Sequence, residues 1–147
     1  MSTSLDKITQ QREVIAWFEI PASDFERAVE FYRNALSFKV QVILLNGVKH
    51  GIVRNRFSDA RGDIVEAPTR ISEGGPVLFF RAQYDVSLTL SNVVTAGGEI
   101  IVPKTLITDS IGTGQTRIPL THIDNRIGYF AKFKDSEGNH IAIYGNS

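Results

Sequence analysis

The chain has 147 residues and a mass of 16.3 kDa, and its 16 Lys and Arg residues balance 16 Asp and Glu residues. This length favours one globular domain, or two small halves that share a core. The balanced charge gives no basic face for nucleic acid or for an anionic membrane surface. The absence of cysteine excludes disulfides, thiolate zinc sites and cysteine nucleophiles. With no signal sequence or membrane-spanning run, a cytoplasmic protein is expected.

The first half of the chain predicts a β-α-β-β-β order of elements. Residues 14–20 are a short apolar run closed by Pro21, which predicts a strand. Ser23 and Glu26 match a capping box that begins a helix, and an apolar stripe with helical spacing continues to Leu36. Three further strands are predicted over 38–45, 48–54 and 63–67, the first two joined by a hairpin turn at 46–47.

The second half repeats this order of elements. Residues 76–80 match the first strand, and Asp85 opens a helix 61 residues after Asp24. That helix ends in Gly97-Gly98, a left-handed cap signal. The remaining strands are predicted over 99–103, 128–133 and 139–144, with an inserted loop at about 106–125. The sequence therefore predicts a single domain with module one at about 14–70 and module two at about 75–145.

In combination, these motifs resemble the vicinal oxygen chelate superfamily, which includes glyoxalases, bleomycin resistance proteins and extradiol dioxygenases. The resemblance covers nearly the whole chain and rests on the segments 17–24, 26–33, 96–98 and 134–139. It implies an α+β fold in which two tandem βαβββ modules form a curled mixed sheet, a cup, with the helices outside. It also implies a homodimer, because relatives with two modules per chain often pair.

The resemblance further implies a divalent metal held by the first and last strand of each module. The first-strand ligand, usually histidine, lies seven residues before the aspartate that opens the helix, where this chain has Trp17 and Leu78. The last-strand ligand, usually glutamate, lies four residues after the turn glycine, where this chain has Glu66 and Ala142. Only Glu66 offers an oxygen to a hard cation. The sequence therefore does not support a metal, and it indicates no other cofactor.

Strand alternation predicts which further residues share the cup with these four positions, because residues two apart point to the same face. The predicted lining is Trp17, Glu19, Glu66, Leu78, Phe80, His140, Ala142 and Tyr144. An aromatic surface with a few polar groups is typical of a small-molecule pocket.

The individual candidates also have structural interpretations. Glu66 and Glu19 are favoured as exposed or ion-paired carboxylates. His140 could be a substitute metal ligand, a general base or a polar residue at a strand start, and the last is favoured. Trp17 could stack on a planar ligand or fill the space of the missing metal. His50 and His122 are expected to be solvated.

Three functions remain open. We favour a metal-independent binding protein of the glyoxalase and bleomycin-resistance type, which holds a small, partly aromatic molecule in the cup. The alternative is a lyase, isomerase or dioxygenase-like enzyme that uses Glu66, Glu19 and His140 as a relocated metal site or as a metal-free acid–base set. The third is a structural or regulatory module whose cup is plugged by Trp17 and Phe80. Nucleic acid and membranes are not expected as partners.

Overall fold

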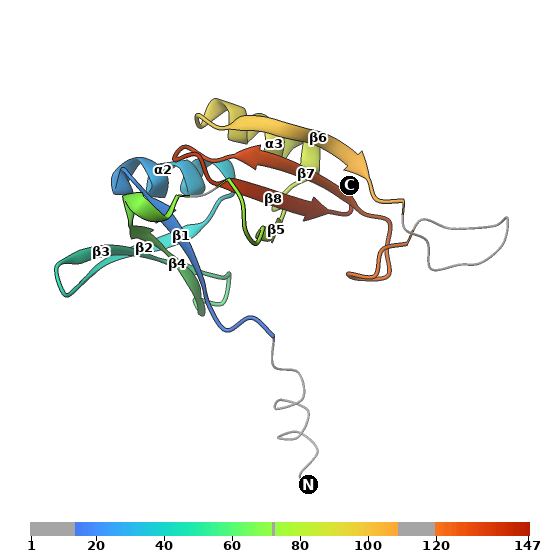
Figure 1. The fold of residues 1–147 in the computed structure, drawn as a ribbon. Coiled ribbons are helices and arrows are strands. Elements are labelled where there is room, and N and C mark those ends of the chain that lie inside the picture. The colour runs from blue at the N-terminus through green and yellow to red at the C-terminus, as the bar shows by residue number, and fades with distance from the viewer. Residues whose placement is uncertain (1–13, 72, 109–119) are drawn as a thin grey trace, which may run out of the picture.

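The computed structural model describes residues 14–71, 73–108 and 120–147, which form two mixed four-stranded sheets and two α-helices (Figure 1). Sheet A has the order β1-β4-β3-β2 and comprises β1 (Phe18–Ala22), β2 (Lys39–Leu45), β3 (Val48–Arg54) and β4 (Ala60–Glu66). Sheet B has the order β5-β8-β7-β6 and comprises β5 (Phe79–Arg81), β6 (Glu99–Leu106), β7 (Tyr129–Lys134) and β8 (His140–Gly145). The fold is α+β with two tandem βαβββ modules, as predicted.

In each sheet the first strand pairs in parallel with the last, and the other neighbours are antiparallel. The parallel pairs require a crossover, which α2 (Phe25–Ala35) and α3 (Val86–Thr95) provide. A short 3-10 helix, η1 (Pro68–Arg70), follows β4. Among the described residues, no helix is long and apolar enough to cross a membrane.

The N-cap of α2 is Asp24, one residue after the predicted Ser23. The Asp24 carboxylate accepts a hydrogen bond from the backbone N–H of Arg27 at 3.1 Å, which satisfies one of the unpaired donors at the helix start. The Ser23 hydroxyl instead donates to Glu137 of module two at 2.9 Å. The predicted capping box is therefore wrong, because the Ser23 hydroxyl bonds to a residue of the other module. Asp85 caps α3 in the same way as Asp24 caps α2.

Strand ends differ from the prediction mainly at the edges of the sheets. β1 begins four residues later than predicted and continues through Pro21, and β6 continues through Pro103 to Leu106. Both are edge strands, where a proline is tolerated because its missing N–H can face away from the ladder. The Asn46-Gly47 hairpin turn is confirmed, with φ values of +52° and +78° at the two positions.

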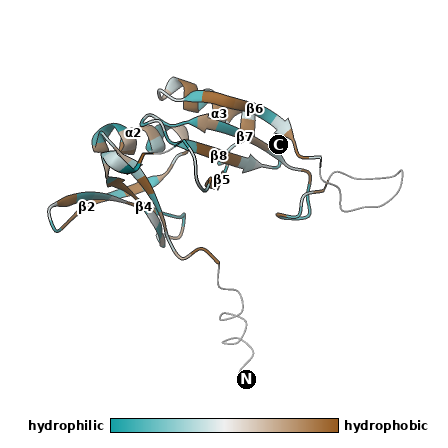
Figure 2. Ribbon diagram, in the orientation of Figure 1, coloured by the Kyte–Doolittle hydropathy of each residue, from teal (hydrophilic) through white to brown (hydrophobic). Residues whose placement is uncertain are grey.

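Aromatic rings from both modules form one continuous core. The Phe80 ring meets Phe18 edge-on at 5.1 Å and Phe38 at 5.0 Å, and Phe38 stacks on Tyr32 at 5.5 Å. The apolar stripe predicted for the first helix is buried and consists of Phe25, Ala28, Val29, Tyr32 and Leu36. Figure 2 shows much of β8 in brown, the colour of apolar residues. The two Phe80 contacts bury apolar surface from both modules at once, and the buried residues of both modules form one cluster.

Candidate ligand-binding site

A hollow of about 480 Å³ lies where β1 of module one meets the start of β8 in module two. Its apolar walls include Ile15, Trp17, Pro76 and Leu78. Its polar walls are Glu19, Arg70, Asn139 and His140. The volume lies within the roughly 300–1,000 Å³ of small-molecule sites, and the mixture of apolar walls with a few polar groups is also typical of them.

Trp17 stands immediately before β1 and is 43% exposed. Trp17 is one of the residues that line the hollow. An exposed aromatic face of this kind can stack on a planar ligand.

Three of the four polar side chains already have partners. The Arg70 Nη1 donates to the Glu19 Oε1 at 2.9 Å. The Asn139 amide nitrogen donates to the Pro21 carbonyl at 2.8 Å and to Asp135 at 2.9 Å. By contrast, the His140 Nε2 is buried and makes no hydrogen bond. A buried polar atom without a partner is costly, but this nitrogen has almost no accessible surface and does not face the open hollow.

The eight predicted lining residues divide into two groups. The hollow brings together four of them, which are Trp17, Glu19, Leu78 and His140. The other four, Glu66, Phe80, Ala142 and Tyr144, lie elsewhere. Phe80 is held in the core between Phe18 and Phe38.

Tyr144 belongs to a polar network beneath the loop that precedes β7. Its hydroxyl donates to the Asp124 carboxylate at 2.7 Å and lies 2.8 Å from the Thr121 hydroxyl. Hydrogen bonds from Tyr144, Asn146 and Thr121 lower the pKa of Asp124 to about 2, against the smaller opposing effect of burial. This network fixes residues 121–128 onto β8. Residues 109–119 of the predicted loop lie outside the described residues.

The four positions matched to metal ligands do not converge, because the two modules differ in strand phase: equal residue counts reach opposite faces of their sheets. Register partners in a parallel pair share a face. Glu66 pairs with the fully buried Ala22, whereas Glu19 pairs with Asp63 on the opposite face of sheet A. Ala142 pairs with the half-exposed Phe79, so it faces away from the core residues Ile141 and Ile143. The predicted equivalence of Glu66 and Ala142 is therefore wrong.

The same phase difference separates the first-strand positions. Ile20, which faces the core, lies four residues before Asp24, whereas Phe80, which also faces the core, lies five residues before Asp85. Counting seven residues back from each aspartate thus reaches opposite faces, with Trp17 outward and Leu78 against the core. The residues at these positions do not fit a divalent ion. Within the described ranges, no group of three His, Cys, Asp or Glu side chains could hold one either.

His50 was expected to be solvated, and this expectation is wrong. Its Nδ1 lies 2.5 Å from the Asp63 Oδ2, and the two side chains are only 16% and 4% exposed. The pair joins β3 to β4 on the face of sheet A that also carries Glu19. The register of β3 with β4, in which Ile52 pairs with Asp63 and His50 with Val65, brings the two side chains to one face. His122 is exposed, as expected.

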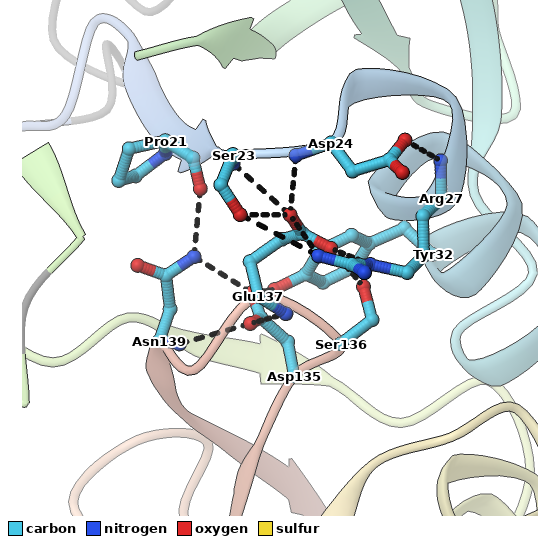
Figure 3. A network of polar contacts seen from close by, with 9 residues as sticks. All are labelled: Pro21, Ser23, Asp24, Arg27, Tyr32, Asp135, Ser136, Glu137 and Asn139. Carbon is cyan, nitrogen blue, oxygen red and sulfur yellow. Dashed lines mark hydrogen bonds and ion pairs between the residues drawn. The ribbon is translucent and has the colours of Figure 1, made fainter. Parts of the chain in front are cut away.

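Sequence reasoning also missed a polar clasp between the two modules (Figure 3). The turn between β7 and β8 directs Glu137 at the start of α2, where its Oε1 accepts hydrogen bonds from the backbone N–H groups of Ser23 and Asp24 at 3.0 and 2.7 Å. Its Oε2 accepts from the Arg27 Nε at 2.7 Å. The carboxylate thereby interacts with both the positive end of the α2 dipole and the guanidinium of Arg27.

Asp135 completes the clasp below Glu137. Its carboxylate accepts hydrogen bonds from the Tyr32 hydroxyl at 2.5 Å and from the Asn139 amide at 2.9 Å. Burial raises the pKa of Asp135, and these hydrogen bonds oppose the effect in part. Because Asn139 also reaches the Pro21 carbonyl, the clasp holds β1 against β8 and so fixes the floor of the hollow.

No family model matches the chain, and no curated protein sequence matches it. Solved structures do match it. A glyoxalase/bleomycin resistance protein from Albidiferax ferrireducens has a TM-score of 0.63 at 16% identity, covering 90% of this chain and 99% of the other. An antibiotic binding protein from Streptomyces has a TM-score of 0.58 at 20% identity, covering 93% and 98%.

A third match is a glyoxalase/bleomycin resistance protein/dioxygenase family enzyme from Burkholderia phytofirmans, with a TM-score of 0.57 at 15% identity and coverage of 90% and 98%. These similarities extend over nearly the whole of each chain. They confirm the predicted resemblance at the level of fold: the protein has the vicinal oxygen chelate fold of glyoxalases, bleomycin resistance proteins and related dioxygenases. A fold hosts many activities, so function must come from the site.

Proposed function

We propose that the protein binds a small, partly aromatic molecule in the hollow between β1 and β8, without a metal. The observation that carries this proposal is the hollow itself, in which an exposed tryptophan and the Glu19–Arg70 ion pair line one space of about 480 Å³. The antibiotic binding protein of similar fold supports small-molecule binding as a use of this architecture.

The roles within the site follow from the geometry. The Trp17 indole offers a flat apolar surface, and Leu78 and Pro76 add apolar contact. The accessible atoms of Glu19 and Arg70 offer hydrogen bonds at the wall. Planar stacking supplies affinity, and polar contacts at the wall fix the orientation of the ligand. The homodimer and the cytoplasmic location remain predictions.

The test is calorimetric binding of a small uncharged aromatic compound, naphthalene-1-carboxamide, to the wild type and to Trp17→Ala. We expect Trp17→Ala to weaken binding by about tenfold, since the loss of one aromatic contact of about 1–1.5 kcal/mol corresponds to that factor. Phe57→Ala removes another exposed aromatic ring that is not part of the hollow, and it should leave affinity unchanged.

Two results would contradict the proposal. Equal affinities of the wild type and Trp17→Ala would show that the hollow is not the binding site. Stoichiometric nickel, zinc, manganese or iron in the purified protein, lost in His140→Ala, would instead favour the enzyme alternative. Glu66 lies on the other face of its sheet from Glu19, so these two carboxylates do not converge on one metal ion.

A further inference from the structure

We propose that Glu19 sets the charge selectivity of this site by neutralising Arg70, so that the ligand is an uncharged planar molecule with a hydrogen-bond donor beside an acceptor. This inference rests on the proposed function and adds the chemical class of the ligand. Within the described part of the chain, Glu19 and Arg70 are the charged side chains that line the hollow. Their charges cancel.

The two side chains meet from different elements. Glu19 comes from β1, and Arg70 ends η1. Their 2.9 Å contact uses one guanidinium nitrogen and one carboxylate oxygen. The side chains remain 40% and 52% exposed, so the pair stands at the wall with its remaining atoms accessible. Exposed pairs of this kind contribute at most about 1 kcal/mol to stability. We therefore assign the pair to ligand recognition.

The accessible atoms of the pair form a donor beside an acceptor. Arg70 has five N–H donors in a planar fork, and one of its nitrogens donates a hydrogen bond to Glu19. The second oxygen of the Glu19 carboxylate can accept a further hydrogen bond. A carboxamide or lactam presents a carbonyl oxygen next to an N–H, which complements this edge.

An anionic ligand is repelled by a like charge at the same place. A carboxylate that approaches Arg70 also approaches Glu19, and the like charges repel each other in a partly desolvated site. A cationic ligand that approaches Glu19 meets Arg70 in the same way. Trp17 and Leu78 keep the wall beside the pair apolar.

The experiment compares three probes of equal size, naphthalene-1-carboxamide, 1-naphthoate and 1-naphthylmethylammonium, by calorimetry at pH 7. We expect the wild type to bind the carboxamide at least tenfold more tightly than either ion. Glu19→Gln should raise the affinity for 1-naphthoate about tenfold, because Arg70 is then unpaired. Arg70→Gln should raise the affinity for the ammonium probe, and the double variant should again favour the carboxamide.

Asp59→Asn is the matched control, because it removes an equal charge from an exposed ion pair with Arg61 that is not part of the hollow. Its probe preferences should equal those of the wild type. Wild-type affinity for 1-naphthoate equal to that for the carboxamide, or a Glu19→Gln variant with unchanged preferences, would overturn the inference while leaving the binding function intact. Failure of every probe to bind the wild type would overturn the proposed function and this inference with it.

Discussion

At the scale of single residues, Glu137 illustrates how one side chain can connect two modules. Its side chain is fully buried from solvent even though its partner Arg27 is 54% exposed. Burial by itself raises the pKa of Glu137, but hydrogen bonds from Arg27, the Asp24 backbone, Ser136 and Ser23 outweigh burial and lower it to about 2. The ionised form is therefore the one that the folded protein stabilises.

The sign of the pH dependence follows from this direction. The ordinary pKa of 4.5 governs the unfolded chain, and the pKa of about 2 governs the folded one. The stabilisation is therefore complete above about pH 4.5 and is lost as the pH falls toward 2. Glu137→Gln should lower the free energy of unfolding by about 2 kcal/mol at pH 6, and the difference from the wild type should shrink at pH 3.

Urea unfolding at a series of pH values measures this difference. The opposing contribution from the raised pKa of Asp135 is common to both proteins and cancels in the comparison. Glu73→Gln is the control, because Glu73 is 72% exposed and its ion pair with Lys134 is long at 3.6 Å. A Glu137→Gln difference that stays constant from pH 6 to pH 3 would contradict the assigned role.

At the scale of elements, the turn between α3 and β6 shows what packing adds to a local signal. The Gly97-Gly98 pair ends the helix, and Gly97 has a φ of +105°, which favours glycine. Gly98 has a different requirement, since a Cβ there would lie 2.8 Å from the Lys134 carbonyl oxygen and 2.7 Å from the Val93 side chain. The second glycine therefore lets the turn approach β7 closely.

Gly98→Ala should lower the free energy of unfolding by about 1–3 kcal/mol, because a backbone oxygen cannot move aside as a flexible side chain can. Gly74→Ala is the matched control, since a Cβ at Gly74 would meet nothing within 4 Å, and its effect should stay within about 0.5 kcal/mol. Midpoints of urea unfolding measure both. Equal midpoints for Gly98→Ala and the wild type would show that the close approach is not tight.

At the scale of the whole molecule, the aromatic core and the clasp join the two modules into one unit. Phe18 of module one and Phe80 of module two are in direct ring contact, and the clasp joins the turn between β7 and β8 to the start of α2. Since the hollow lies between β1 and β8, its shape depends on this junction. The site is therefore a product of module packing.

A double-mutant cycle with Phe18→Leu and Phe80→Leu tests the junction. We expect a coupling free energy of about 0.5–1.5 kcal/mol, because edge-on ring pairs contribute this much beyond their buried area. The cycle of Phe18→Leu with Phe57→Leu should be additive, since the exposed Phe57 ring makes no contact with Phe18. Separate unfolding transitions by Trp17 fluorescence and by circular dichroism, or no coupling, would contradict a shared core.

The sequence by itself determined the order of elements, the α2 stripe and the repeat of the two modules, because periodicity and turns are local properties that each segment carries alone. It also identified Trp17, Glu19, Leu78 and His140, all of which line the hollow. Only the tertiary structure decided that Phe80 belongs to the core and that Glu66 faces away from Glu19. The physical reason is strand phase: a shift of one residue moves every side chain to the other face. Residue counts from a turn or a helix start cannot detect that shift, and they cannot reveal contacts such as that between Glu137 and α2, which form only when the modules pack.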